Sequence, residues 1–402
     1  MSGSGGPAAP RQGTWSVYIH FPWCLKRCAY CDFATAVSVQ IPREAYLEAI
    51  LAELAIRTRD LQPAPIATVF FGGGTPSLWG PQPVAAVLGW LDRWAGLAQG
   101  SEITLEANPG AAEEGDLRGY VAAGVNRISL GVQALDDKRL ALLDRVHDAA
   151  AARQTLSLLG RWVADGQLQS ASADLLFGAP SQDLTRLRAD VDGVLGHGLP
   201  HLSAYALTVE EGTPLATRVD RGLQAPPDDD LQMRMLMQMP ALVGAHGLER
   251  YEVSNFSKPG HRSRHNLVYW QGGHYLAAGV GAHGYLPTES GEIRYGNTRQ
   301  HRDYLSALGP GKRAQPVLAE ALRETVTPAM RLSELLLTGL RLDDGLDLRS
   351  VERDCGAAAL QRLLERVQRA QTRGYSIETD GHFIRVAADA TERLDAVIRE
   401  LA

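Results

Sequence analysis

Three of the four cysteines in the chain lie within eight residues of one another. Cys24, Cys28 and Cys31 follow the pattern C-x3-C-x2-C in the segment FPWCLKRCAYCDF, whereas Cys355 lies near the other end of the chain. A disulfide-stabilised secreted domain would use more cysteines and would spread them along its sequence. The cluster therefore indicates thiols that act together at one site.

Three roles are open to these thiols. Free cysteines are often buried in cores, but Lys26, Arg27 and Asp32 stand between or beside them, which is typical of a loop. A zinc site would need a fourth ligand, and Cys355 lies in a charged, helical context. An iron–sulfur cluster fits better, because three thiolates can hold a [4Fe-4S] cube and leave one iron open to a small molecule.

Six short runs of mostly apolar residues would position this loop, which directly follows the first of them. The runs are continuous rather than alternating, and this favours parallel strands that are buried on both faces. They cover residues 16–20, 67–71, 102–106, 127–131, 173–177 and 202–208.

Helical segments separate these runs. Residues 42–59 begin with proline and then place Tyr46, Ile50 and Leu54 at intervals of four, as on one face of a helix. Strand, helix, strand repeated about six times predicts an α/β fold with a parallel sheet, either open or closing into a barrel. The other helices of this pattern are expected at residues 84–97, 113–123, 136–144 and 184–195.

Polar or glycine-rich motifs come at the ends of four consecutive strands. The second strand ends in Gly73-Gly74-Thr75, and the third ends at Glu106. The fourth strand ends near Gln133 with Arg145 shortly after it, and the fifth carries Asp174. Each motif alone is an ordinary strand end, but the carboxyl ends of parallel strands meet at one mouth. We therefore expect these side chains to surround the cysteine loop.

The chain changes in character after residue 208. Residues 228–245 are helical and rich in methionine. Met233, Met235, Met237 and Met239 alternate by two, so they cannot all lie on one helix face, and core filling is their favoured role. Residues 251–285 then concentrate histidines and aromatic residues. The histidines are His261, His265, His274 and His283. A structural role is favoured for His261, His274 and His283.

Residues 311–402 form a separate pattern. Helices are expected at 328–340 and within 348–373, followed by a hairpin over 375–386 with a type I′ turn at Asp380-Gly381. This order predicts a small winged-helix-like domain. Its 14 Lys or Arg against 15 Asp or Glu argue against DNA reading and favour a packing or lid role.

Composition narrows the class of protein. The chain has 402 residues with 45% hydrophobic and 21% charged residues, as in globular proteins, and its formal charge of -6 argues against a general nucleic-acid binder. There is no apolar stretch of membrane-spanning length, and residues 1–13 have no signal-peptide core. The expected compartment is the cytoplasm, where thiols stay reduced.

The cysteine motif resembles that of the radical S-adenosylmethionine (SAM) superfamily. The segments VYIHFPWC, FFGGGTPSL, LEANP, RISLGVQ, LLDRVH and DLLFGAP resemble the oxygen-independent coproporphyrinogen oxidase group within it. The resemblance implies a partial (β/α)6, TIM-like barrel over residues 16–310. Glycine, serine and proline near the start indicate a flexible tail at 1–15, and the pattern of helices and hairpin gives the C-terminal domain at 311–402. By the same resemblance Cys24, Cys28 and Cys31 bind a [4Fe-4S] cluster, and SAM is bound by Tyr18, Gly73, Gly74, Thr75, Glu106, Gln133, Arg145 and Asp174.

One departure separates the chain from the oxidases. They carry a fourth cysteine, C-x3-C-x2-C-x-C, at the position that is Phe33 here. Cys31-Asp32-Phe33 instead resembles the HemW-type haem chaperone branch, and so does the segment HNLVYW that begins at His265. That resemblance implies haem handling, with His265 either a haem ligand or a structural residue. Imidazole is a common axial ligand of haem iron.

Two functions remain in competition, with a purely electron-transferring cluster protein as a minor third. The first is a haem chaperone that passes haem to an unidentified acceptor protein, and possible contact with a membrane surface would come through that acceptor. The second is a radical SAM enzyme that oxidatively decarboxylates coproporphyrinogen III. Phe33 and the HNLVYW segment favour the chaperone. The electron donor is not identified by the sequence, and no nucleic-acid partner is expected.

Overall fold

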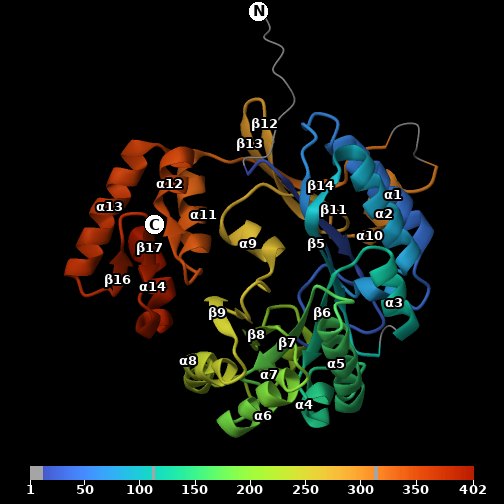
Figure 1. Cartoon of the computed structure of the whole chain (residues 1–402), viewed down its shortest axis with the longest axis horizontal. Coiled ribbons are helices and arrows are strands. Elements are labelled where there is room, and N and C mark those ends of the chain that lie inside the picture. Colours follow the sequence, from blue (N-terminus) through green and yellow to red (C-terminus); the bar gives the residue numbers. More distant parts are fainter. Residues whose placement is uncertain (1–11, 111–113, 312–315) are drawn as a thin grey trace, which may run out of the picture.

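The computed structural model describes residues 12–110, 114–311 and 316–402 and is built around one nine-stranded sheet (Figure 1). Six neighbouring strands run parallel, and each is linked to the next by helical segments. They are β1 (Trp15–Phe21), β4 (Ile66–Gly73), β5 (Leu97–Ala107), β6 (Arg127–Gln133), β7 (Ser170–Phe177) and β8 (His201–Ala206). All six strands predicted from the sequence are confirmed.

The sheet is extended at both ends by short strands. β11 (Leu276–Ala278) pairs in parallel with β1. At the other end β10 (Asn255–Ser257) pairs antiparallel with β8, and β9 (Glu249–Glu252) pairs antiparallel with β10. The strand order is β11-β1-β4-β5-β6-β7-β8-β10-β9, and within the described residues its two end strands do not pair with each other. The predicted partial barrel is therefore an open, curved parallel sheet, and the α/β class is confirmed.

The helices that connect the parallel strands pack on the outer face of the sheet (Figure 1). Several begin at an aspartate whose carboxylate accepts a hydrogen bond from a backbone N–H in the first turn, as Asp148, Asp183 and Asp228 do. The connecting helices are α1 (Arg43–Arg57), α2 (Pro81–Ala95), α3 (Glu114–Ala122), α4 (Asp137–Leu142), α5 (Ala149–Ala164) and α6 (Leu184–Leu195). Two more helices, α7 (Pro214–Asp220) and α8 (Asp229–Gly244), follow β8 and lead to β9. Of these, α5 and α7 were not expected from the sequence.

The prediction for the methionine-rich helix α8 is half right. Met235 and Met239 are buried in the main core, as expected for residues four apart on one face. Met233 and Met237 lie on the opposite face and are exposed. The reason is the two-residue spacing, which a helix cannot direct to a single side.

The two faces of the parallel sheet differ in chemistry although both are covered. On β1, Val17 and Ile19 point into the apolar core beneath the helices, whereas Tyr18 and His20 point to the inner side. On β7, Ala173 lies in the core and Asp174 lines an inner cavity. Burial on both faces is thus confirmed, but the inner face is polar. Because successive side chains of a strand point to opposite faces, every second residue of these strands places a polar group on the inner face, toward the site.

Two further elements bound the inner side. Helix α9 (Arg264–Trp270) contributes His265 and Tyr269 to the cavity over the sheet. A second sheet of β12 (His283–Thr288), β13 (Gly291–Asn297) and β14 (Glu320–Thr325) follows β11, and α10 (His301–Leu308) connects β13 to β14.

The C-terminal part has its own apolar core. This core joins α11 (Pro328–Gly339), α12 (Leu348–Cys355), α13 (Ala357–Thr372) and α14 (Leu394–Leu401) to the small sheet of β15 (Leu346–Asp347), β16 (Ile377–Thr379) and β17 (Phe383–Val386). The expected helices and hairpin are present. The expected type I′ turn is wrong, because Gly381 has a positive φ of 84° and Asp380 does not.

The boundaries of the domains stay a prediction. Residues 1–11 of the expected tail lie outside the described residues. From Gln12 on the chain is held, since the Gln12 amide hydrogen-bonds the backbone of His274 and Trp15 is fully buried. Beyond residue 311, β14 pairs with β13, and the separate core begins at α11.

No helix within the described ranges has the length and hydropathy needed to span a bilayer.

Candidate functional site

The cysteine loop is anchored to the mouth of the sheet at its middle. Cys24 ends the two-residue strand β2 (Trp23–Cys24), which pairs with β3 (Ala36–Val37) and so closes the loop. Between them, the buried Ala29 donates its N–H to the carbonyl of Leu143 at 3.0 Å and accepts from the N–H of Leu215 at 2.8 Å. The loop is therefore held from α4 on one side and α7 on the other.

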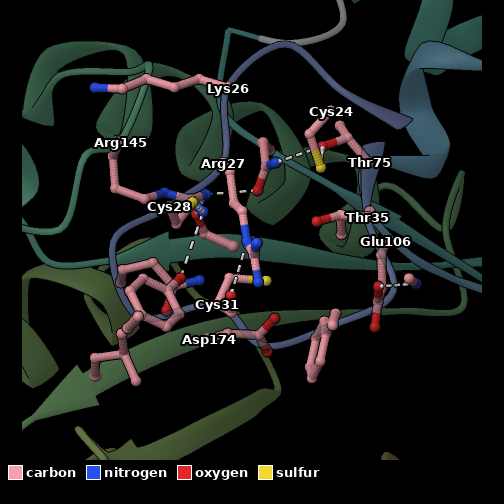
Figure 2. A pocket seen from close by; sticks show the side chains of 18 of the residues that line it. Cys24, Lys26, Arg27, Cys28, Cys31, Thr35, Thr75, Glu106, Arg145 and Asp174 are labelled. Atoms are coloured by element: carbon pink, nitrogen blue, oxygen red, sulfur yellow. Dashed lines mark hydrogen bonds between the residues drawn. The ribbon is translucent and has the colours of Figure 1, made fainter. Parts of the chain in front are cut away.

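All three thiols are free and half-buried around one cavity of about 350 Å³. Figure 2 shows their sulfur atoms at separate points around this cavity. Arg145 donates from Nη1 to Cys28 Sγ at 3.2 Å, and Thr75 donates from Oγ1 to Cys24 Sγ at 3.5 Å. Burial raises the pKa of the Cys24 thiol to about 11 and also raises that of Cys31.

Arg145 is the polar centre of the site. Besides Cys28, its guanidinium reaches the carbonyl of Gly131 at 2.7 Å and Oδ1 of Asn108 at 2.5 Å. The Asn108 amide in turn donates to Thr75 Oγ1 at 3.1 Å. Hydrogen bonds thus join the ends of β4, β5 and β6 to the cysteine loop, as Figure 2 shows in part.

The glycines at the end of β4 make room for that loop. Gly73 has a φ of 113°, and a Cβ built on it would lie 2.6 Å from the ring of His20. A Cβ on Gly74 would lie 2.8 Å from backbone atoms of Pro22 and Trp23. Only glycine permits this approach of β4 to the chain after β1. The glycine run is thus explained by contact with the protein itself.

Two carboxyl groups face the same cavity with raised pKa values. Burial, together with the neighbouring Asp174, raises the pKa of Glu106 to about 8, although the N–H of Gly73 donates to Glu106 Oε2 at 3.0 Å. Burial likewise raises the pKa of Asp174 to about 6, against hydrogen bonds from Ser129 and Ser203. This pair places acid groups that bind protons near neutral pH beside the thiols.

The structure gathers nearly all the residues predicted for SAM around the cavity of the thiols. Tyr18 is the exception: it lies behind Glu106, in two adjoining cavities of about 240 and 450 Å³ that Glu106 also lines. Those that line the first cavity are Gly73, Gly74, Thr75, Glu106, Gln133, Arg145 and Asp174.

Asn108 was not predicted to belong to the site. Its position two residues after Glu106, at the end of the same strand, was the available signal.

Gln133 has an additional feature, a positive φ of 65° that is unusual for a residue with a side chain. Backbone strain of this kind is concentrated at functional sites.

His265 lies in the smaller adjoining cavity and is almost fully buried. Its Nδ1 hydrogen-bonds Thr68 Oγ1 at 2.7 Å, its Nε2 hydrogen-bonds the Tyr269 hydroxyl at 2.7 Å, and its ring stacks on Phe70. Burial lowers the pKa of His265 to about 3, which keeps the imidazole neutral. Both ring nitrogens are engaged, so binding of iron by His265 would require one of these bonds to break.

Comparison with known proteins gives consistent results across the chain. Residues 18–161 match the Radical SAM superfamily, and residues 326–389 match the HemN C-terminal domain. Over its whole length the chain superposes on the coproporphyrinogen III oxidase HemN of Escherichia coli. The TM-score is 0.78 at 19% identity, over 98% of this chain and 89% of the other, a similarity of fold.

Sequence relatives are closer. The chain is 38% identical over 362 residues to "Heme chaperone HemW" of Mycobacterium tuberculosis, covering 88% of this chain and 87% of the relative. It is 38% identical over 350 residues to "Radical S-adenosyl methionine domain-containing protein 1, mitochondrial" of Bos taurus, covering 85% and 77%. Together with the three cysteines, Phe33 and the arrangement of the strand ends, these matches show that the chain belongs to the HemW family of the radical SAM superfamily.

Proposed function

We propose that this protein is a haem chaperone. It holds a [4Fe-4S] cluster through Cys24, Cys28 and Cys31, binds SAM beside that cluster, and passes haem to an acceptor protein. The observation that carries the proposal is the single mouth at which three free thiols meet the polar ends of four strands. The names of the relatives, which are haem chaperones, support haem as the cargo.

The donor set suits a cluster with one open iron. The three sulfur atoms stand apart around the cavity (Figure 2), which fits three ligands that each bind a different iron. The cluster, when bound, supplies an open iron to which the amino and carboxylate groups of SAM can attach. Arg145 and Thr75 donate hydrogen bonds to two of the sulfurs, and such bonds stabilise thiolate ligands.

The remaining residues suit a charged, polar ligand such as SAM. The carboxyls of Glu106 and Asp174 face the cavity and can pair with a sulfonium, an ammonium or ribose hydroxyls. Arg145, Asn108 and Thr75 hold one another in place and so orient the rim before any ligand arrives. The glycine backbone at residues 73 and 74 leaves this rim narrow and free of side chains.

Phe33 distinguishes the chaperone from the oxidase. It follows the cysteine loop and is 60% exposed, at the position where the oxidase pattern has a fourth cysteine. An apolar ring on the surface at this point can contact a flat, apolar macrocycle. It cannot serve as a thiol ligand.

One experiment separates the two functions. The full chain, reconstituted anaerobically with iron and sulfide, is titrated with haem and followed by absorbance. A parallel sample receives coproporphyrinogen III, SAM and reductant. We expect a saturable shift of the Soret band and no steady formation of protoporphyrinogen.

Either opposite result is decisive. Steady protoporphyrinogen formation would assign the protein as the oxidase, and a wild type without a saturable Soret shift would refute the chaperone. A Cys24→Ala, Cys28→Ala, Cys31→Ala triple variant that still holds four irons would refute the cluster assignment.

A further inference from the structure

A groove of about 450 Å³ opens beside the cysteine loop, on the side away from the strand ends of β6 and β7. It lies next to the cavity of the thiols, because Asp32, Phe33, Gly73 and Glu106 line both. Its volume is within the range of pockets that bury small organic ligands. The groove therefore offers space for a second ligand adjacent to the proposed SAM site.

His283 presents an unengaged imidazole to this groove. It is the first residue of β12, is exposed, and lies opposite Gly296 on β13. No hydrogen bond or ion pair of its imidazole is found with any of the described residues. Gly296 gives the ring its place, because a Cβ there would lie 2.6 Å from His283 Cε1.

The other imidazoles near the groove have no free nitrogen. His20 Nε2 lies 3.0 Å from the carbonyl of Ala34, which can only accept, so Nε2 carries the proton. His20 Nδ1 then accepts from the Tyr18 hydroxyl at 3.0 Å. His265, behind the groove, also uses both ring nitrogens. Among these three histidines, His283 alone can bind a ligand without losing an existing bond.

The groove also has apolar walls and one available positive charge. Phe33 is exposed at its rim, and Tyr269 and Tyr275 meet edge to face with ring centroids 4.7 Å apart. Arg299 donates to the backbone carbonyl of Asp32, and no carboxylate among the described residues pairs with it. Aromatic walls with a free guanidinium at the edge suit a flat apolar molecule that carries a carboxylate.

The turn before His283 keeps this arrangement close to the cysteine loop. Gly281 has a φ of 66°, and a Cβ on it would lie 2.5 Å from the Cβ of Ala34. Its N–H donates to the carbonyl of Thr298 at 2.8 Å, beside Arg299. The positions of His283 and Arg299 relative to Phe33 are therefore fixed by the backbone.

We propose that this groove is the haem site, with His283 as the axial ligand of the iron, Arg299 paired with a propionate, and Phe33, Tyr269 and Tyr275 along the porphyrin. This assignment rests on the proposed function, since haem as cargo comes from there. It places haem in the cavity next to the SAM cavity, with Glu106 lining both.

The electrostatics agree with a neutral ligand imidazole. Partial burial lowers the pKa of His283, and the positive charges of Arg294 and Arg299 lower it further. A neutral imidazole has the lone pair that a metal requires. Glu106, which also lines the groove, has its pKa raised to about 8, so without a cationic ligand beside it this carboxyl adds little negative charge opposite a propionate at neutral pH.

The test is haem titration of the full-length wild type and of His283→Ala, with absorbance and electron paramagnetic resonance as readouts. His382→Ala, which removes an exposed histidine of the C-terminal hairpin, is the matched control. We expect His283→Ala to lose the histidine-ligated spectrum and to bind haem about tenfold or more weakly, as when metal-site contacts are removed. Added imidazole should restore the spectrum.

Two further variants keep the result clear if His283→Ala folds poorly. Gly296→Ala retains the histidine but displaces its ring and should also lose the spectrum. Arg299→Ala should keep the spectrum and weaken binding by about twofold to fivefold, the range of an exposed ion pair.

The outcomes separate the two proposals. A wild type without a Soret shift refutes the chaperone function itself. A wild type that binds haem, with His283→Ala unchanged in spectrum and affinity, overturns this site alone. Loss of the spectrum in His265→Ala and not in His283→Ala would assign the ligand to His265 instead.

Discussion

At the scale of single residues, the site is defined by groups whose ionisation is opposed by their surroundings. Glu106 is buried beside Asp174, and both carboxyls have raised pKa values because burial disfavours their charged forms. Ligands with a positive charge would reverse this preference. Ionising these two buried acids therefore costs free energy, and a cationic ligand such as SAM would offset that cost on binding.

Replacement of Glu106 should change how stability depends on pH. The pKa of Glu106 rises from an ordinary 4.5 to about 8 on folding. Between these values the folded chain keeps a proton that the unfolded chain releases, so the free energy of unfolding must fall as pH rises. The cost is about 1.4 kcal/mol for each unit of difference in pKa, so the full rise from 4.5 to about 8 corresponds to about 5 kcal/mol. Glu106→Gln should lose this dependence.

Urea unfolding of wild type and variant at about pH 5, 6.5 and 8 measures the effect. Glu365→Gln, at an exposed position on α13, is the control and should follow the wild type. Parallel curves for wild type and Glu106→Gln would show that Glu106 keeps an ordinary pKa.

At the scale of elements, a buried carboxylate joins α1 to the segments that follow β11. Glu53 accepts hydrogen bonds from Arg57 Nε at 2.6 Å, Asn297 Nδ2 at 2.7 Å, the Gly279 N–H at 2.9 Å and the Tyr304 hydroxyl at 2.6 Å. All four oxygen lone-pair positions of this fully buried group are thus used. The turn after β11, which leads to His283, is held by this carboxylate.

Removal of that carboxylate should weaken several elements at once. Glu53→Ala leaves the buried guanidinium of Arg57 without one of its carboxylate partners and leaves three further donors unpaired. We expect a loss of about 3–5 kcal/mol in the free energy of unfolding, the cost of breaking a buried ion pair. Denaturant unfolding measures it, and Glu44→Ala, exposed in the first turn of the same helix, should cost less than about 1 kcal/mol. A small effect of Glu53→Ala would mean that water replaces the carboxylate there.

At the scale of the whole molecule, the parallel strands and the cysteine loop could be predicted, because their signals are local. Apolar runs, helix periodicity and the C-x3-C-x2-C spacing are each contained in a few residues. Convergence of Glu106, Arg145 and Asp174 also followed from one rule about strand ends. The polar inner face of the sheet was missed, because residues such as Ser129 and Ser203 become informative only when the two faces of a strand are separated.

Contacts between distant segments could not be predicted. The sequence singled out His265 among the four histidines through the HNLVYW segment and favoured a structural role for His283. Which ring nitrogens are engaged depends on partners such as Thr68 for His265, which are far away in the chain. Gly73 and Gly74 line the cavity of the thiols, but the close approach of Gly73 to His20 and of Gly74 to Pro22 and Trp23 could not be predicted from the sequence. Such reasons exist only in the folded molecule.

The C-terminal part lies beside α9 (Figure 1), and α11 contacts this helix. Arg331 on α11 is buried and donates from Nη2 to the carbonyl of Gly272 at 2.6 Å and to Asp354 at 2.9 Å. The backbone of Val253 donates to the carbonyl of Arg341 at 3.1 Å. Gly272 lies just after α9. Movement of the C-terminal part would therefore shift the end of the helix that carries His265 and Tyr269.

Replacement of Arg331 should therefore loosen this junction while each core stays folded. Arg331→Ala removes the link to Gly272 and one partner of Asp354, and we expect increased amide hydrogen exchange at residues 251–253 and 272–275. The exchange within α13, which lies in the separate C-terminal core, should change little. Arg366→Ala is the control, since among the described residues its guanidinium bonds within the C-terminal part, to the carbonyls of Leu401 and Ala402. If exchange rises equally across α13 in Arg331→Ala, then Arg331 supports the C-terminal core itself and not the junction.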